Sequence, residues 1–168
     1  MNESEPDEKN APAALAWIAG ILNSRNIPFQ VTGGLAALAY GSTRPLADID
    51  IDVPDESLAV LAELLAGRVV SGPARYRDGE WDIMLLTVNY AGCEIDLGGV
   101  PGAKVFDRSA RSWVPLATDL ESAVRLKVFG VEVPVIARDA LIAYKRRLDR
   151  DVDRMDITAM ESSPSDAS

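Results

Sequence analysis

Three aspartates alternate with apolar residues in the segment ADIDIDV, residues 47–53. In a β-strand, alternate side chains point to the same face and lie about 6.6 Å apart along the chain, so Asp48, Asp50 and Asp52 would place three carboxylates on one face. Like charges at this spacing repel one another, and a cation or water must compensate them. The triplet therefore predicts either a cation-binding strand or a solvent-facing acidic strand whose isoleucines pack inward. By itself it favours neither.

A calcium-binding loop of the EF-hand type is a further alternative. A loop of this type that begins at Asp48 needs glycine at its sixth position and glutamate at its twelfth. Those positions hold Val53 and Ala59. The sequence therefore excludes this kind of calcium loop.

Two glycines, Gly33 and Gly34, lie upstream of the aspartates, between a predicted strand over 27–32 and a predicted helix over 35–40. A helix start offers unpaired backbone N–H groups and the positive end of the helix dipole, and both favour a bound phosphate. A Gly-Gly pair alone more often marks a tight turn than a ligand site. Beside a strand that carries carboxylates, however, it favours a site for a metal-bound triphosphate.

Histidine is absent from the 168 residues, and Cys93 is the only cysteine. The absence of histidine excludes catalytic triads that use it, HExxH zinc sites and imidazole acid–base chemistry. A single cysteine excludes internal disulfides and cysteine-based metal clusters, and we expect Cys93 to pack in the core. Carboxylates and cationic side chains must therefore carry any chemistry.

The net charge of −9 is concentrated at the two ends of the chain. Residues 1–9 carry −3 and residues 149–168 carry −4, which leaves −2 for residues 10–148. We expect disordered tails over 1–9 and 161–168 around one domain over 10–160. No run approaches the ~20 apolar residues of a membrane span, so we also expect a cytoplasmic protein without a membrane partner.

Hydrophobic periodicity and turn residues predict alternating helices and strands. Helices are expected over 11–24, 35–40, 57–66, 138–149 and 152–160, and strands over 27–32, 49–53, 69–77, 82–89, 93–97, 123–129 and 131–136. The middle of the chain is rich in strands and its end is helical. The two carboxylate-bearing segments, 49–53 and 93–97, are both strands.

The segment GGLAALAYGSTRPLADID resembles the polymerase-β-like nucleotidyltransferase superfamily, whose motif is a glycine pair, about a dozen residues and Asp-x-Asp. Here Gly33-Gly34, thirteen intervening residues and Asp48-Ile49-Asp50 match that motif. The stretch is similar to small bacterial members, including abortive-infection toxins and lincosamide or aminoglycoside nucleotidyltransferases. The resemblance implies an α+β fold, with a mixed β-sheet, helices packed against it and short C-terminal helices. It also implies that Asp48 and Asp50 are the metal pair and that Asp52 is an extra, outer carboxylate.

The resemblance also implies a third carboxylate on a later strand. Asp96 is preferred because Ile95 and Leu97 flank it; Glu94 is a second candidate, and Asp82 is a poorer one. The alternative for Asp96 is a strand residue held in a salt bridge.

Two basic residues are implied to contact the triphosphate. Lys145 lies in a C-terminal segment that looks like the helix-lysine-aspartate ending of these transferases, and Arg44 lies four residues before Asp48. For Lys145 the alternative is a solvated position in the Lys-Arg-Arg run. For Arg44 it is a structural salt bridge to Asp48 or Asp50.

The implied activity is transfer of a nucleoside monophosphate from an NTP to a hydroxyl acceptor, with two Mg²⁺ or Mn²⁺ ions held by Asp48, Asp50 and Asp96. RNA, protein and small molecules all remain open as acceptors, and an antitoxin protein remains open as a partner. The acidic total charge favours a cationic drug, whereas a cluster of basic residues favours RNA: Arg138, Lys145, Arg146, Arg147, Arg150 and Arg154. An inactive nucleotide-binding module, such as one member of a toxin–antitoxin pair, and a plain α/β scaffold with a solvated acidic strand are the other two hypotheses.

Overall fold

The computed structural model describes residues 9–163, in which nine strands form one mixed sheet. The strands run in the order β7-β6-β4-β5-β2-β1-β9-β8, and β3 pairs with β4 outside this order. Their bounds are β1 Gln30–Thr32, β2 Ile49–Pro54, β3 Val69–Arg77, β4 Trp81–Tyr90, β5 Cys93–Val100, β6 Lys104–Asp107, β7 Ser112–Pro115, β8 Val124–Val128 and β9 Val131–Val135. The pairs β2–β5 and β1–β9 are parallel and the others are antiparallel, so the predicted α+β fold with a mixed sheet is confirmed.

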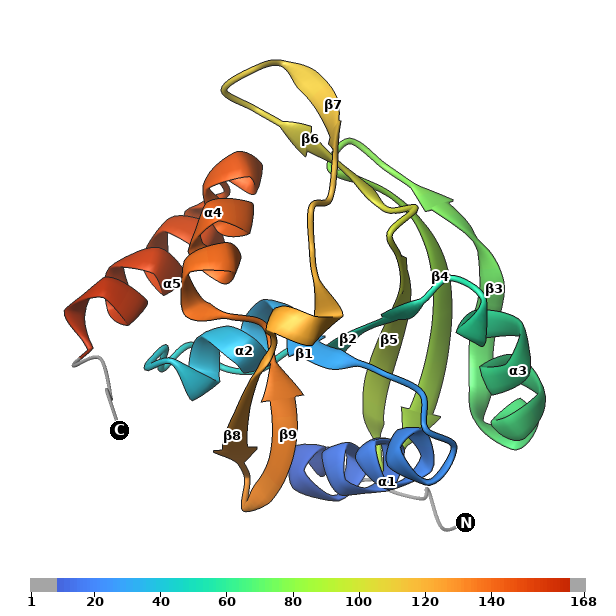
Figure 1. Ribbon diagram of the computed structural model, residues 1–168. Coiled ribbons are helices and arrows are strands. Elements are labelled where there is room, and N and C mark those ends of the chain that lie inside the picture. The colour runs from blue at the N-terminus through green and yellow to red at the C-terminus, as the bar shows by residue number, and fades with distance from the viewer. Residues whose placement is uncertain (1–8, 164–168) are drawn as a thin grey trace, which may run out of the picture.

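Five α-helices surround this sheet in the described part of the chain (Figure 1). They are α1 Ala11–Ser24, α2 Gly33–Ala39, α3 Ser57–Leu64, α4 Arg138–Leu148 and α5 Asp151–Ser162, and short 3₁₀ turns cover Ala66–Arg68 and Leu120–Ser122. Figure 1 shows α4 and α5 together on one side of the molecule and α3 beside β3 on the other. None of the helices in residues 9–163 is both long enough and apolar enough to cross a membrane.

The core lies between helix α1 and the central strands. Asn10 begins α1 by accepting a hydrogen bond from the backbone N–H of Ala13, and Leu15, Ile18 and Leu22 then face inward at helical spacing. They pack in one apolar cluster with the buried side chains of the central strands. Cys93 is fully buried there, so its predicted place in the core is confirmed.

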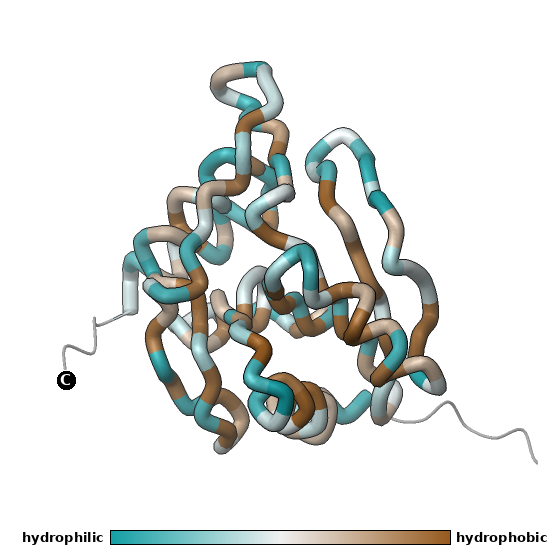
Figure 2. The backbone as a smooth tube through the Cα atoms, turned by 45° about the vertical axis from the view of Figure 1, so that its right-hand side comes forward, coloured by the Kyte–Doolittle hydropathy of each residue, from teal (hydrophilic) through white to brown (hydrophobic). Residues whose placement is uncertain are grey.

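Strand β3 lies at an edge of the sheet, and among the described strands it pairs only with β4. All of its residues except Val69 are exposed, and its register against β4 shifts on both sides of Ser71. Figure 2 shows that the β3–β4 hairpin is more apolar toward its base and hydrophilic at its tip. One face of β4 nevertheless turns toward the interior, where it helps to line the site described below.

Most predicted elements are present, with three differences. Helix α2 begins at Gly33 rather than at residue 35, so both glycines belong to its first turn. Helix α5 continues to Ser162, two residues past the expected domain boundary, and most of both predicted tails lies outside the described residues. The hairpin β6–β7 was not predicted, because each of its strands has only four residues and neither shows a sustained apolar alternation.

Candidate active site

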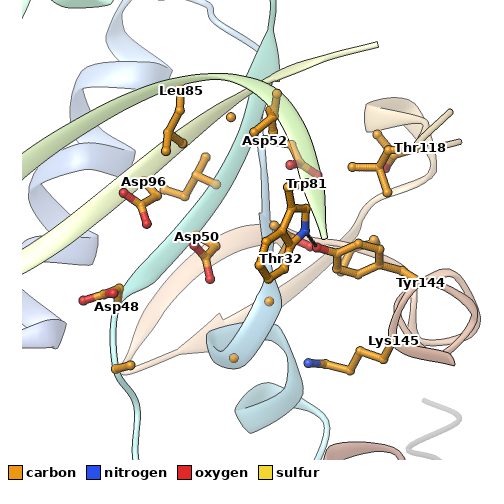
Figure 3. Close-up of a pocket in the computed structure, with 18 of the residues that line it drawn as sticks. Thr32, Asp48, Asp50, Asp52, Trp81, Leu85, Asp96, Thr118, Tyr144 and Lys145 are labelled. Atoms are coloured by element: carbon orange, nitrogen blue, oxygen red, sulfur yellow. Dashed lines mark hydrogen bonds between the residues drawn. The ribbon is translucent and has the colours of Figure 1, made fainter. Parts of the chain in front are cut away.

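A cavity of about 430 Å³ opens between the sheet and the C-terminal helices (Figure 3). Its walls come from the β1–α2 junction, from β2, β4 and β5, from residues 116–118 and from α4 and α5. The seven residues preferred in the sequence analysis for metal or triphosphate binding all line it: Gly33, Gly34, Arg44, Asp48, Asp50, Asp96 and Lys145. The structure thus brings together side chains from segments more than 100 residues apart.

Asp50 and Asp96 lie directly opposite each other on the parallel strands β2 and β5. Asp48 precedes β2 and is partly buried. Burial, followed by the charges of Asp96, Asp48 and Asp52, raises the pKa of Asp50 to about 7, and the charge of Lys145 opposes this shift. Burial also raises the pKa of Asp96, although the Thr87 hydroxyl donates a hydrogen bond to it over 2.6 Å.

These carboxylates fit a divalent cation by their chemistry. Carboxylate oxygens are hard ligands of the kind that Mg²⁺ prefers. Burial and then neighbouring negative charge raise the pKa of Asp50, and a bound cation would offset that charge. Within residues 9–163 no three His, Cys, Asp or Glu side chains form a preassembled group of metal ligands. We therefore regard Asp48, Asp50 and Asp96 as side chains that share a cavity and would have to draw together around an ion.

Gly33 lets the chain pass close to Asp50. Its φ is +61°, a conformation that favours glycine, and a Cβ at this position would collide with Oδ2 of Asp50. At Gly34 a Cβ would lie 3.4 Å from Nη2 of Arg44. The glycine pair thus lies between Asp50 on one side and Arg44 on the other.

The basic side chains of the cavity are held by two buried aspartates of α5. Asp156 lies 2.8 Å from Nη2 of Arg44 and 3.0 Å from Nζ of Lys145, while Asp153 lies 3.3 Å from the same Nζ. The side chain of Lys145 is only 2% exposed. The alternative of a solvated Lys145 is therefore wrong. Arg44 does form a salt bridge, as its alternative stated, but its partner is Asp156 and not Asp48 or Asp50.

Burial acts to raise the pKa of Asp156, but hydrogen bonds from Arg44, Lys145 and Ser42 outweigh it and hold that pKa at about 2. Asp153 additionally accepts hydrogen bonds from Arg150, over 2.7 Å from Nε. Sequence reasoning did not single out Asp153 or Asp156. Their spacing of three residues puts both carboxylates on one face of α5, and that spacing was the available signal.

Asp52 departs from its prediction. It was expected to be an outer carboxylate, but it is 5% exposed, lines the cavity and accepts a hydrogen bond over 2.8 Å from the Gln30 amide. Burial raises its pKa to about 6, and the Gln30 hydrogen bond acts in the opposite direction. Glu94 is exposed and is not among the cavity's lining residues, and Asp82 forms an ion pair with Arg75.

An aromatic pair that sequence reasoning missed bridges the sheet and α4. The indole N–H of Trp81, on β4, donates a hydrogen bond to the Tyr144 hydroxyl over 2.6 Å, and the Arg150 guanidinium lies 4.8 Å from the Trp81 ring centre. Burial raises the pKa of Tyr144. Figure 3 shows this pair between Asp52 and Lys145. No local sequence pattern links residues 63 positions apart.

Solved structures share this fold. TM1012 of Thermotoga maritima, provisionally named a nucleotidyltransferase, matches with a TM-score of 0.60 and 15% identity over 78% of this chain and 81% of that one. The lincosamide antibiotic adenylyltransferase LnuA, solved with lincomycin, gives 0.59 and 14% over 89% and 96%. The factor ANT(2")-Ia, solved with adenylyl-2"-tobramycin, gives 0.56 and 17% over 89% and 88%.

No protein-family model matches the sequence, and no curated protein matches it. At 14–17% identity the likeness is one of fold. The chain has the fold of the nucleotidyltransferases, as its glycine-aspartate motif led us to expect.

Proposed function

We propose that the protein is a metal-dependent nucleotidyltransferase, which moves a nucleoside monophosphate from an NTP to a hydroxyl acceptor. The observation that carries this proposal is the pairing of Asp50 with Asp96 on adjacent parallel strands, beside Gly33 and in one cavity with Asp48. The adenylyltransferase fold neighbours support it.

Asp48 and Asp50, with Asp96, would hold Mg²⁺. When bound, the metal would supply positive charge at the phosphates and lower the pKa of the acceptor hydroxyl. Asp96 would take the hydroxyl proton through Oδ2, since the Thr87 hydroxyl occupies Oδ1 and burial raises the pKa of this carboxyl. The deprotonated oxygen attacks the α-phosphorus, the bond to the bridging oxygen breaks, and pyrophosphate leaves.

The other cavity residues would bind and orient the triphosphate. The backbone at Gly33 and Gly34 would approach the phosphates without side-chain obstruction. Arg44 and Lys145 would offset their negative charge, in positions fixed by Asp153 and Asp156. The proposal includes no antitoxin partner, because no feature of the described residues calls for one.

The experiment is to incubate the protein with each α-³²P-labelled NTP and Mg²⁺, in the presence of total RNA, lysate proteins, lincomycin or tobramycin. We expect label in one acceptor class with the wild type, and at least a ~10³-fold lower rate with Asp50→Asn, which keeps the side chain's size and removes its charge. Glu94→Gln removes a charge from the exposed face of β5 and should label as the wild type does. Equal labelling by Asp50→Asn would contradict the proposal.

An inactive nucleotide-binding module is the second candidate. One observation favours it: Arg44 and Lys145 are both paired with Asp156, and this pairing offsets the positive charge that they could offer to a triphosphate. It predicts that Mg²⁺-ATP binds and raises the unfolding temperature while no acceptor becomes labelled.

A further inference from the structure

One end of the cavity lies away from Gly33, Gly34 and the proposed metal ligands, and we call it the Asp52 chamber. It is lined by Asp52, Trp81, Ile83, Leu85, Thr118 and Tyr144. Three of these residues, Trp81, Ile83 and Leu85, alternate along β4 and therefore share one face of that strand. They form an apolar wall on the same face of the sheet as Asp52, with β5 between β4 and β2.

Strand pairing fixes where the chamber lies. On β1 and β2, Thr32 pairs with Asp50 and Gln30 pairs with Asp52, and Gly33 follows Thr32. Along β2 the chamber therefore lies beyond Asp50, on the side away from the glycine pair. In a nucleotidyl transfer the acceptor oxygen attacks opposite the departing pyrophosphate, so a triphosphate at the glycines leaves the far side of Asp50 to the acceptor.

Asp52 carries a buried negative charge without a cation beside it. Its Oδ2 accepts from the Gln30 amide, which is neutral and also donates to Thr118 over 2.6 Å, and among the described residues no Lys or Arg forms an ion pair with it. Its Oδ1 lies near Gly98, where a Cβ would come within 3.9 Å. Burying an ionised carboxylate that is 5% exposed and has only neutral hydrogen-bond donors lowers the free energy of unfolding. A cationic ligand would offset that loss.

We propose that the Asp52 chamber binds the acceptor, and that the acceptor is a small molecule with one protonated amine on an apolar body. The amine pairs with Asp52, and Ile83 and Leu85 cover the apolar body. This inference rests on the proposed nucleotidyl transfer.

Other acceptor classes fit the chamber less well. A polyamine would leave most of its charges against the apolar wall of β4, and RNA would bring phosphates against the Asp52 carboxylate. A neutral nucleobase would leave that buried charge unpaired. Two strand positions separate Asp52 from Asp50, so the reacting hydroxyl should lie roughly 7 Å from the amine.

The test uses a small cationic probe and its neutral counterpart, 2-amino-1-phenylethanol and its N-acetyl derivative. Each is titrated by NMR into the wild type, Asp52→Asn and Glu94→Gln. Asparagine can still accept the Gln30 hydrogen bond, and Glu94→Gln removes the same charge from an exposed site. We expect the wild type to bind the cationic probe at least about tenfold more tightly than the neutral one, Asp52→Asn to lose that preference, and Glu94→Gln to keep it.

A second titration includes saturating Mg²⁺ and α,β-methylene-ATP, a nucleotide that cannot transfer its nucleotidyl group. The cationic probe should remain bound, because the nucleotide and the acceptor occupy opposite sides of Asp50. Displacement of the probe would assign the chamber to the nucleobase and overturn the inference. Equal binding of the two probes by the wild type would also overturn it, even if Asp52→Asn failed to fold.

Failure of this inference can be told apart from failure of the proposed function. If the amine binds through Asp52 but no acceptor is ever labelled, the proposed transfer is wrong and the amine site stands. If a neutral acceptor is labelled and Asp52→Asn labels it equally, the transfer stands and the chamber assignment is wrong.

Discussion

Burial, and then the charges of Asp96, Asp48 and Asp52, raise the pKa of the Asp50 carboxyl to about 7. Near neutral pH, its protonated and ionised forms are comparably populated in the folded protein. A bound cation and the proton therefore compete for the same group, so metal affinity should rise as the pH rises through about 7.

Asp50→Asn should stabilise the metal-free fold at pH 8. The pKa of Asp50 is about 7 in the folded chain against 3.8 ordinarily, so the folded state binds more protons than the unfolded state between these values, and the free energy of unfolding falls as the pH rises from about 4 to about 7. Asparagine removes this penalty, a gain on the order of 2–4 kcal/mol at pH 8 that disappears near pH 4. Urea unfolding in EDTA at both pH values measures it.

The matched control is Glu94→Gln, an exposed carboxylate on the neighbouring strand, which should change stability little at either pH. A gain for Asp50→Asn of the same size at pH 4 and pH 8 would refute the assignment of the penalty to its ionised form.

Two glycine substitutions should act in opposite directions. Gly33→Ala should destabilise the protein by about 1–3 kcal/mol and weaken nucleotide binding, because its φ is +61° and the new Cβ would press on Asp50. Gly20→Ala, on the exposed face of α1 with no atom within 4 Å of the new Cβ, should stabilise it by about 0.5–1 kcal/mol. Thermal unfolding of both variants is the measurement, and two shifts of the same sign would contradict the argument.

Sequence reasoning named several residues that line the cavity. Gly33, Gly34, Asp48 and Asp50 lie in one short motif, whereas Asp96 and Lys145 were named through the family resemblance. Trp81 and Tyr144 were missed because their pairing depends on tertiary contact between β4 and α4. The burial of Asp52 was missed for a related reason: strand alternation gives the face of a side chain, but not what covers that face.

At the scale of elements, α5 acts as a support for the basic wall of the cavity. Its Asp153 and Asp156 contact Lys145 on α4, Arg44 before β2 and Arg150 between the two helices. Three cationic side chains are thereby fixed by two carboxylates one turn apart. The C-terminal helices are thus part of the site rather than an appendage to the sheet.

Asp156→Asn should destabilise the protein by about 2–4 kcal/mol at pH 7, since it leaves Lys145 and Arg44 with a weaker partner in a buried place. The pKa of Asp156 is lowered to about 2, so its stabilisation is complete above pH 4 and is lost as the pH falls through about 2. The difference between variant and wild type should shrink accordingly in urea unfolding from pH 7 down to pH 2.

Asp151→Asn provides the comparison on the same helix. Asp151 is almost fully exposed and pairs with Arg154 over 3.2 Å, so its loss should cost less than about 0.5 kcal/mol. If both variants cost the same, the buried network would not be what holds α5 in place.

The elements were predicted more reliably than their partners in space. Long amphipathic helices such as α1 and α4 can be recognised because their apolar residues recur with a period of 3.6 residues. The hairpin β6–β7 and the placement of β3 at the sheet edge depend on pairings that no local period encodes. The sequence could therefore predict an α+β protein, but not the order of its strands.

At the scale of the whole molecule, the cavity lies where the sheet meets the C-terminal helices. A ligand that contacts both Asp50 on β2 and Lys145 on α4 would tie these two parts together. Ligand binding would then make local unfolding of α4 and α5 less frequent, because that unfolding would have to break ligand contacts as well as protein contacts.

Mg²⁺ with α,β-methylene-ATP should slow amide hydrogen exchange in α4 and α5, by about tenfold or more at saturating ligand. Helix α3, which contributes no residue to the cavity lining, should exchange at the same rate with and without the ligand. EDTA should restore the original rates in α4 and α5. Protection confined to α3, or protection unchanged by EDTA, would contradict a metal-dependent site at this junction.

The irregular path of β3 has a consequence for how this protein behaves in crowded solution. A straight nine-residue edge would offer its free N–H and C=O groups to a strand of another molecule, the step that begins fibril growth. Here two register shifts, Pro73 and the exposed Arg75 and Arg77 interrupt that edge. These features oppose the addition of a strand from another molecule at β3, and we expect this edge not to start aggregation in concentrated samples.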